Sequence, residues 1–495
     1  MSTAPFNTAP LTLQNVRPYD GGEPVDVQIA DGLISAIAPA GTVTAVGETV
    51  DGAGRWIGPG LWDAHLHFTQ HVIRRRRIDL TETRSAADVL DVVRRARDEG
   101  APLTDGILMG YGFRDGLWPV PASLAALDAV VSDIPVVLVS GDLHCGWMNR
   151  AAEARFGIEL DETGLLREVP WIALLHSFDA VGDLPLSAYR EAADAASARG
   201  VVGVVEYENT DNVTEWSERT AQGLDALRVD IAVWPDRLEA AIAQGLRTGD
   251  IVDERGLVEF GRLKVVVDGS LNTRTAWCWD PYPGMDPAHP HACGLESVPI
   301  PELRRLLGLA RAGGIEAAVH AIGDRANTEV LDTFEALDMR GVIEHAQLVR
   351  EEDFARFAAL GLIASVQPEH AMDDRDVADH HWAGRTARAF AFGSLHRAGA
   401  PLRLGSDAPV APLDPWISLS AATARSRGDR DAWHPEQRLP LDVALAASVR
   451  STLAVGQPAD LVISDGDPYA ADRDALRGMP VAATLLGGRF TWRQL

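Results

Sequence analysis

The stretch Ile57-Gly-Pro-Gly-Leu-Trp-Asp-Ala-His-Leu-His67 is an apolar run that ends in two histidines separated by one residue. Successive side chains of a strand point to opposite faces, so His65 and His67 are expected on the same side. Neutral imidazole is a common metal ligand, and two imidazoles at the end of a strand can share one ion. A short motif of this kind also arises by chance, so its meaning depends on whether further ligands follow.

Further candidate ligands stand at the ends of later apolar runs. His320, His345 and Asp407 each close such a run, and Lys264 lies within another. A polar side chain in a buried run costs several kcal/mol unless something binds it. For any one of these residues a hydrogen-bonded core side chain is the simpler explanation. Four histidines and one aspartate, all at predicted strand ends, favour a metal site.

The middle of the chain alternates apolar strand runs with alanine-rich helical runs, which is the pattern of repeated βα units. Helices are expected at residues 301–312 and 327–337, where large apolar side chains recur at helical spacing. Eight such units predict an α/β fold, a (β/α)₈ TIM-like barrel whose chemistry sits at the carboxyl ends of its strands. The expected strands are residues 57–67, 201–207, 228–233, 262–268, 315–320, 341–345, 362–367 and 401–407.

The two ends of the chain differ from its middle, because they contain short strands broken by turn residues, including an Asp31-Gly32 hairpin signal. We therefore expect a small β-sandwich built from residues 1–56 and 440–495, with the barrel at residues 57–439. Residues 69–200 are too many for one βα connection. They are interpreted as a long insertion after the first barrel strand, placed to cover the barrel mouth.

Charge and composition restrict the classes of partner. With 45 basic and 71 acidic residues the net charge is −26, which argues against nucleic-acid and membrane partners. No apolar run approaches the roughly 20 residues of a membrane helix, and the N-terminus lacks a secretory signal. The cysteines are 3 in number, which favours a reducing compartment over a disulfide framework. We expect a cytoplasmic homodimer whose partner is a small-molecule substrate.

The candidate ligands also carry a family resemblance. The set His65-x-His67, Lys264, His320, His345 and Asp407 resembles the amidohydrolase superfamily of metal-dependent hydrolases. The surrounding phrases are similar to its YtcJ-like and N-substituted formamide deformylase-like branch, amidohydrolase family 3, and they recur in the family's order over nearly the whole chain. They include Pro59-Gly-Leu-Trp-Asp-Ala-His-Leu-His67, Ser140-Gly-Asp-Leu-His-Cys-Gly-Trp-Met-Asn149, His320-Ala-Ile-Gly-Asp-Arg-Ala326, Glu344-His-Ala-Gln-Leu348 and Gly405-Ser-Asp-Ala-Pro409.

The resemblance implies a metal site at the barrel mouth, with zinc as the expected divalent ion. In a binuclear form, His65, His67 and Asp407 hold one ion and His320 and His345 hold the other. Lys264, carboxylated on its amine, then bridges the two, because an unmodified ammonium has no lone pair to offer. A mononuclear site that uses the two first-strand histidines, one later histidine and Asp407 is the alternative.

The resemblance also implies hydrolysis of a non-peptide C–N bond, in an amide, an N-substituted formamide or a cyclic amide, by metal-activated hydroxide. Asp407 is the expected base and then acid. Asp63 is either an outer partner that orients the site or an ordinary turn residue. Substrate contacts are expected from His144, Trp147, Asn149, Arg274 and Gln367, with an aromatic rim from Trp118, Trp277, Trp279 and Trp382 and a contribution to specificity from Glu206 or Glu208.

Two other functions are compatible with the same barrel. A deaminase of an aromatic or amidine-like base typically keeps a glutamate three residues after the fifth-strand histidine, where this chain has Gly323. That departure and the presence of Lys264 favour the amide hydrolase. A non-catalytic scaffold is the third hypothesis, and it has no need for a complete set of ligands.

Overall fold

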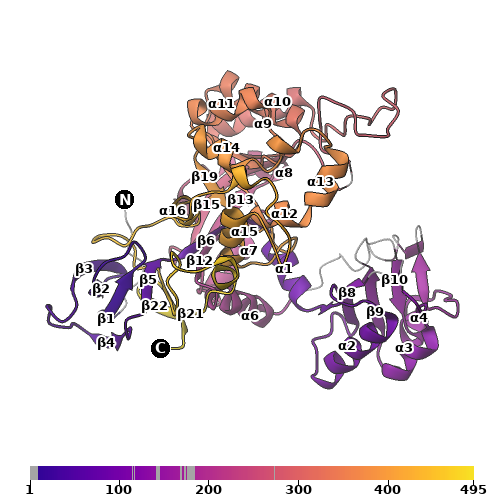
Figure 1. Cartoon of the computed structure of the whole chain (residues 1–495), viewed down its shortest axis with the longest axis horizontal. Helices are drawn as coiled ribbons and strands as arrows, with labels where there is room; N and C mark the ends of the chain where they lie inside the picture. The colour runs from indigo at the N-terminus through magenta and orange to yellow at the C-terminus, as the bar shows by residue number, and fades with distance from the viewer. Residues whose placement is uncertain are drawn as a thin grey trace. The chain divides into compact units, whose positions relative to one another are not determined.

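The structure is a computed structural model, and it describes residues 9–113, 115, 118–140, 145–167, 170–171, 174, 184–272 and 274–495. The chain forms two compact units, the first made of Met1–Phe68 with Arg190–Leu495 and the second of Thr69–Tyr189 (Figure 1). Among the helices described, none is both long and apolar enough to cross a membrane.

The first unit contains a nearly closed barrel of parallel strands. Backbone hydrogen bonds across the closing seam run from the Asp407 amide to the His65 carbonyl, at 2.7 Å, and from the His67 amide to the Ala408 carbonyl, at 2.8 Å. The predicted α/β barrel is confirmed. Its strands follow the order β6 (Leu61–Leu66), β12 (Val201–Glu206), β13 (Arg228–Val233), β15 (Val258–Val266), β16 (Ala317–Ala321), β17 (Gly341–His345), β18 (Ile363–Val366) and β19 (Leu402–Leu404).

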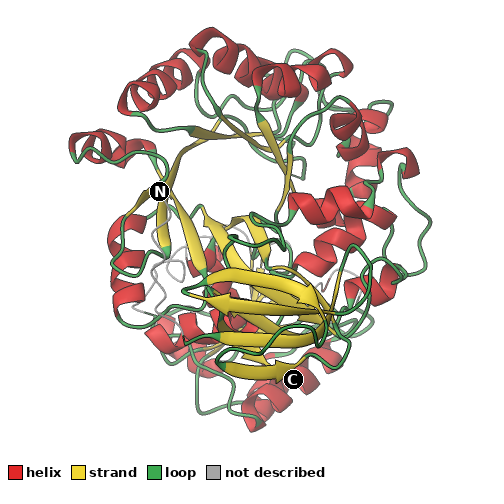
Figure 2. Cartoon of the chain, turned by 90° about the vertical axis from the view of Figure 1, so that its left-hand side faces the viewer, coloured by secondary structure: helices red, strands yellow, loops and turns green. Residues whose placement is uncertain are grey.

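Helices surround this ring of strands (Figure 2). The predicted helices are α9 (Ile300–Gly313) and α10 (Asp324–Leu337), and their apolar faces are buried as the helical spacing required. The others of this unit are α7 (Asn212–Ala221), α8 (Pro235–Ala243), α11 (Phe354–Leu360), α12 (Pro368–Asp373), α13 (Arg375–His381), α14 (Phe392–Arg397), α15 (Pro415–Ala424), α16 (Leu441–Ala447) and α17 (Arg473–Arg477).

Residues 57–67 were expected to form one strand, but they contribute to two. It divides at Gly60 into β5 (Trp56–Pro59), which belongs to the terminal sheet, and β6, which belongs to the barrel. A Cβ on Gly60 would lie 2.4 Å from the Val202 side chain, so only glycine allows this close approach. A Cβ on Gly58 would meet the ring of Tyr19 at 2.3 Å. The Gly-Pro-Gly segment therefore passes the chain from one sheet to the next.

The terminal sheet joins both ends of the chain, as predicted. β20 (Leu461–Ser464) pairs antiparallel with β5, and β5 pairs parallel with β1 (Leu11–Pro18). Asp31, with a φ of 52°, and Gly32 form the predicted hairpin turn between β2 and β3. The other strands of this sheet are β2 (Val25–Ala30), β3 (Leu33–Pro39), β4 (Glu48–Asp51), β21 (Val481–Leu486) and β22 (Arg489–Arg493), and β14 (Asp250–Ile251) flanks the barrel.

The second unit has a sheet and a core of its own. The Ser85 hydroxyl accepts a hydrogen bond from the Asp88 amide and so caps the start of the helix α2 (Ala86–Asp98). Its sheet follows the order β11 (Leu165–Arg167), β10 (Cys145–Met148), β9 (Val136–Ser140), β8 (Leu108–Phe113) and β7 (Ile78–Asp79). Its helices are α1 (Phe68–Arg75, beginning one residue before the unit), α2 (Ala86–Asp98), α3 (Leu124–Val130) and α4 (Arg150–Phe156), and α6 (Leu186–Ser197) then leads into β12. Residues 190–200 of the expected insertion group with the barrel unit.

Candidate metal centre

The predicted ligands converge on one cavity. All six, His65, His67, Lys264, His320, His345 and Asp407, line a cavity of about 500 Å³. They come from the ends of β6, β15, β16 and β17 and from the loop after β19. Parallel strands bring their carboxyl ends to the same face of a barrel, which is why residues so distant in sequence meet there.

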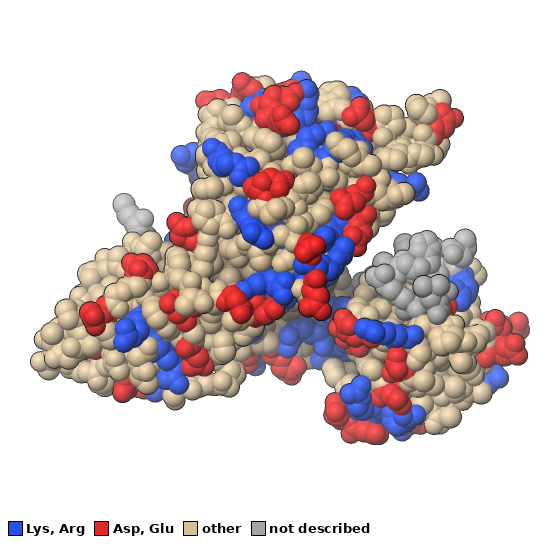
Figure 3. Space-filling model, in the orientation of Figure 1, with Lys and Arg blue, Asp and Glu red and all other residues tan. Residues whose placement is uncertain are grey.

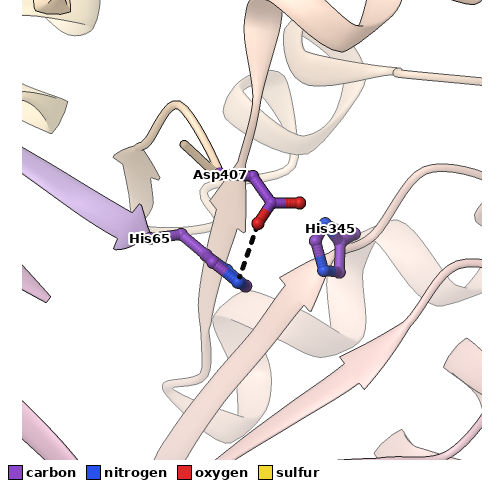
Figure 4. Close-up of side chains that lie close together, drawn as sticks. All are labelled: His65, His345 and Asp407. Carbon is purple, nitrogen blue, oxygen red and sulfur yellow. Dashed lines mark ion pairs between the residues drawn. The ribbon is translucent and has the colours of Figure 1, made fainter. Parts of the chain in front are cut away.

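Three of these residues form the tightest group. One side-chain atom each from His65, His345 and Asp407 lies within 4.8 Å of the other two (Figure 4). The Asp407 Oδ1 atom is 3.5 Å from the Nε2 of His65 and 3.6 Å from the Nε2 of His67. These distances leave room for a cation at the centre, since imidazole nitrogens and carboxylate oxygens bind zinc at about 2.0–2.2 Å.

His65 and His345 each use one ring nitrogen, the Nδ1 atom, for a hydrogen bond to a neighbouring side chain. The His65 Nδ1 atom donates to the Glu344 carboxylate at 2.6 Å, and the His345 Nδ1 atom donates to the Gln367 amide oxygen at 2.8 Å. The Tyr207 hydroxyl donates to the other oxygen of Glu344 at 2.7 Å. Burial lowers the pKa of His65 and of His345 well below its usual value, so both rings are neutral. Each therefore presents the lone pair of its Nε2 atom, and this donor set fits a divalent metal ion.

Lys264 and His320 complete the set from the neighbouring strands. The Lys264 Nζ atom lies 3.5 Å from the His65 Nε2 atom and 4.1 Å from the centre of the Tyr207 ring. Burial lowers the pKa of Lys264 to about 8, against the opposing charges of Glu344 and Asp407. The ring centroids of His320 and His345 are 4.4 Å apart, and burial lowers the pKa of His320 to about 3.

Asp407 is held in an unusual backbone conformation. Its φ is 57° and that of His345 is 73°, in the left-handed region that non-glycine residues rarely occupy. Such strain persists when the surroundings impose it, and it is concentrated at functional sites. Burial raises the pKa of the Asp407 carboxyl to about 7. This carboxyl can therefore exchange a proton near neutral pH.

Asp63 orients the site through the backbone. Its carboxylate accepts hydrogen bonds from the amide of His65, at 3.1 Å, and from the amide of Ser406, at 3.0 Å. It thus ties the end of β6 to the loop that carries Asp407. The neighbouring Gly405 is required for this contact, because a Cβ there would lie 2.6 Å from the His65 nitrogen.

The described residues that were expected as substrate contacts are not among those that line this cavity, and their predicted role stays untested. Trp147 is fully buried in the core of the second unit. Asn149 is equally buried and caps α4 while bonding the backbone of residues 131–136. Arg274 is exposed and is not among the residues that line the cavity. Gln367 is not among them either, and its amide oxygen accepts a hydrogen bond from His345. His144 lies outside the described residues.

The expected aromatic rim also differs. Trp382 is fully buried and Trp277 nearly so, while Trp118 packs against Phe113 in the second unit. Trp279 is 42% exposed but does not line the cavity, and Trp234 is the tryptophan that does. Sequence reasoning gave no role to Trp234, nor to Glu344, Tyr207, Gln347, His370 and Asp374. Glu344 alone carried a signal, as a carboxylate inside an apolar strand next to a predicted ligand.

Glu206 and Glu208 contribute less to the cavity than expected. Glu206 is fully buried and accepts hydrogen bonds from the amides of Phe68, at 3.1 Å, and Glu208, at 2.8 Å. Neither glutamate is among the residues that line the cavity. Glu206 therefore fixes the start of α1 and the end of β12.

Comparison with known proteins agrees with this geometry. The sequence profile of the amidohydrolase family matches residues 48–492, which is most of the chain. The chain belongs to the amidohydrolase family. The family predicted from the ligand set is thereby confirmed, and membership supports a hydrolase.

Two curated relatives align with this chain over most of their own length. LONG AFTER FAR-RED 3 of Arabidopsis thaliana is 28% identical over 88% of this chain and 82% of that protein. YtcJ of Bacillus subtilis (strain 168), named as an amidohydrolase, is 26% identical over 88% of this chain and 89% of that protein. An uncharacterized metal-dependent hydrolase from Pyrococcus horikoshii OT3 has the same fold, with a TM-score of 0.76 at 23% identity, covering 94% of this chain and 99% of that chain.

Proposed function

We propose that this amidohydrolase uses zinc to hydrolyse a non-peptide C–N bond, in an amide, an N-substituted formamide or a cyclic amide. The observation that carries the proposal is the neutral histidine pair. His65 and His345 keep one nitrogen free for a metal while Glu344 and Gln367 hold the other, and Asp407 lies between them. His67, His320 and Lys264 are the remaining candidate ligands.

A bound divalent ion supplies a Lewis acid and lowers the pKa of water to about 7. The chain supplies the proton transfers. Asp407, whose Oδ1 atom lies 3.5 Å from the His65 Nε2 atom and 3.6 Å from the His67 Nε2 atom, takes the proton from the attacking water and delivers it to the leaving nitrogen. One amide and one water then give a carboxylic acid and an amine, with Asp407 restored to its initial state.

Lys264 is proposed to be carboxylated. Because burial lowers the pKa of its amine to about 8, roughly a tenth of that amine is neutral at pH 7, far more than for an exposed lysine. A neutral amine adds to carbon dioxide, and loss of one proton gives a carbamate. The carbamate carries two oxygens and a negative charge, so Lys264 would become a ligand and would compensate the positive charge of the metal.

The deaminase alternative fits this site less well. The residue three positions after His320 is Gly323, at the start of α10. A Cβ there would lie 2.0 Å from the Trp277 carbonyl oxygen, so the backbone leaves no space for any side chain. The glutamate on which such deaminases rely has no equivalent at this position.

The test combines metal analysis of the purified protein with a hydrolysis screen over N-acyl, N-formyl and cyclic amides. We expect a bound divalent ion and activity that Asp407→Asn, His65→Ala and His320→Ala each abolish. Circular dichroism must show that the variants stay folded. Full activity in a folded Asp407→Asn variant would refute the proton-transfer role, and a metal-free, inactive wild-type protein would support the scaffold hypothesis.

A further inference from the structure

One carboxylate in the cavity is not used by the proposed chemistry. Asp374 follows α12 and lines the cavity together with Asn272, Gln347 and His370. Among the cavity-lining residues in the described part of the chain, Asp374 is the one charged side chain outside the candidate ligands. Its position in the cavity of the metal centre makes it a candidate substrate contact.

The Asp374 carboxylate has a neutral partner and, among the described residues, no cationic one. The Asn272 amide donates to its Oδ1 atom at 2.9 Å. The nearby Asp373 and Asp376 pair with Arg427 and Arg430, whereas the ion pairs found over the described residues include none to Asp374. Burial raises the pKa of Asp374 to about 6, which leaves it mostly ionised at neutral pH. A half-buried negative charge without a counter-ion favours a cationic ligand.

Two further polar side chains of the cavity each have one buried atom without a hydrogen-bond partner among the described residues. His370 is 6% exposed and Gln347 is 4% exposed, and in the described structure the His370 Nε2 atom and the Gln347 Oε1 atom make no hydrogen bond. The His370 ring donates to the backbone of Ser406, and a neutral imidazole that donates from one nitrogen accepts at the other. The carboxylate, the imidazole nitrogen and the amide oxygen are all hydrogen-bond acceptors.

We propose that Asp374 binds a cationic nitrogen of the substrate, one that lies apart from the scissile amide. His370 and Gln347 accept hydrogen bonds from the same end of the substrate. This inference rests on the proposed amide hydrolysis and names its substrate class, an N-acylated amine with a second, cationic nitrogen. Asn272 orients the carboxylate. Acidic and basic side chains are interspersed over the face shown in Figure 3, and the net charge of −26 attracts cations over a longer range and so favours the same class.

The test compares amides of matched length on the zinc-loaded protein: N-acetylated alkyl diamines, N-acetylated amino alcohols, N-alkylacetamides and N-acetylated ω-amino acids. We expect the highest kcat/KM for the diamines and the lowest for the amino acids. In Asp374→Asn the KM for the acetylated diamine should rise about tenfold, since a charge-assisted hydrogen bond is lost, with kcat little changed. The neutral N-alkylacetamide should be hydrolysed as before.

Asp376→Asn is the matched control, because Asp376 is exposed and pairs with Arg430 on the surface. It should leave the preference for the diamine unchanged. Asn272→Ala keeps the carboxylate but loses its hydrogen bond, so a smaller rise in KM is expected. Equal kcat/KM for the cationic and neutral amides in the wild type would overturn the inference while the hydrolase stands.

Calorimetry separates this inference from the proposed function. Alkylamines, which are cationic at neutral pH, and uncharged alcohols of matched length are titrated into the zinc-loaded wild type and into Asp374→Asn without any turnover. Tighter binding of the alkylamine, lost in Asp374→Asn, supports the cation subsite even if the protein hydrolyses none of the amides. Equal affinity for the alkylamine and the alcohol in the wild type counts against the subsite, whatever the hydrolysis screen shows.

Discussion

Glu344→Gln is the substitution that best isolates the outer contacts of the metal centre. Glu344 is not among the residues that line the cavity. It acts through its hydrogen bond to the His65 Nδ1 atom, at 2.6 Å. The amide keeps the size of the side chain and one acceptor oxygen but removes the negative charge. The charge favours the tautomer of His65 whose Nε2 lone pair faces the metal.

The expected magnitude follows from the geometry. Both side chains are 1% exposed, so water cannot replace the lost interaction. A hydrogen bond to a charged group contributes about 1.5–3 kcal/mol, and about 1.4 kcal/mol corresponds to a factor of ten in affinity. We therefore expect the zinc affinity to fall about tenfold to a hundredfold, which agrees with the usual cost of removing an outer partner of a ligating histidine.

The assay is competition for zinc against a chromophoric chelator, with chemical unfolding of the metal-free protein measured in parallel. Burial raises the pKa of Glu344, so its ionised form is costly in the folded protein and a neutral amide relieves that cost. The free energy of unfolding should therefore stay constant or rise while the zinc affinity falls. Glu316→Gln, which alters a carboxylate paired with Arg262, serves as the control. Unchanged zinc affinity in folded Glu344→Gln would refute the reasoning.

Three further substitutions test other parts of the structure. Wild-type protein in isotope-labelled bicarbonate should show a carbamate carbon signal by NMR that Lys264→Arg lacks; equal signals in both would exclude carboxylation at this position. Gly323→Ala should lower the free energy of unfolding, measured in denaturant, because its Cβ would lie 2.0 Å from the Trp277 carbonyl oxygen. Burial raises the pKa of Glu206 to about 8 from its usual 4.5, so the folded state keeps a proton that the unfolded state loses. Stability should fall as the pH rises between those values, and Glu206→Gln should flatten that dependence; an unchanged slope would contradict the assignment.

The fold was predictable because its signals are local. Each barrel strand is a short apolar run, so the strand order followed from the sequence alone. The candidate ligands mark the carboxyl ends of β6, β16 and β17, and the structure brings them to one cavity. The division of the opening run was not predictable by the same reasoning. Residues 57–62, which span the break, are uniformly apolar. The break at Gly60 depends on the close approach of Val202, which is distant in sequence.

The substrate contacts were harder to predict, for a physical reason that the two glutamines illustrate. Gln367 ends its strand where a pocket residue was expected, yet its amide oxygen is committed to His345, whereas the Gln347 amide oxygen lies next to the cavity with no partner within the described residues. Position along a strand determines which end of the barrel a side chain occupies. Which neighbour it then contacts depends on the register between strands and on the left-handed turn at His345, where φ is 73°. A set of candidate ligands, defined by residue type and strand end, can therefore be proposed from one sequence. The residues that orient these candidates and would recognise the substrate depend on contacts between segments that only the folded chain brings together.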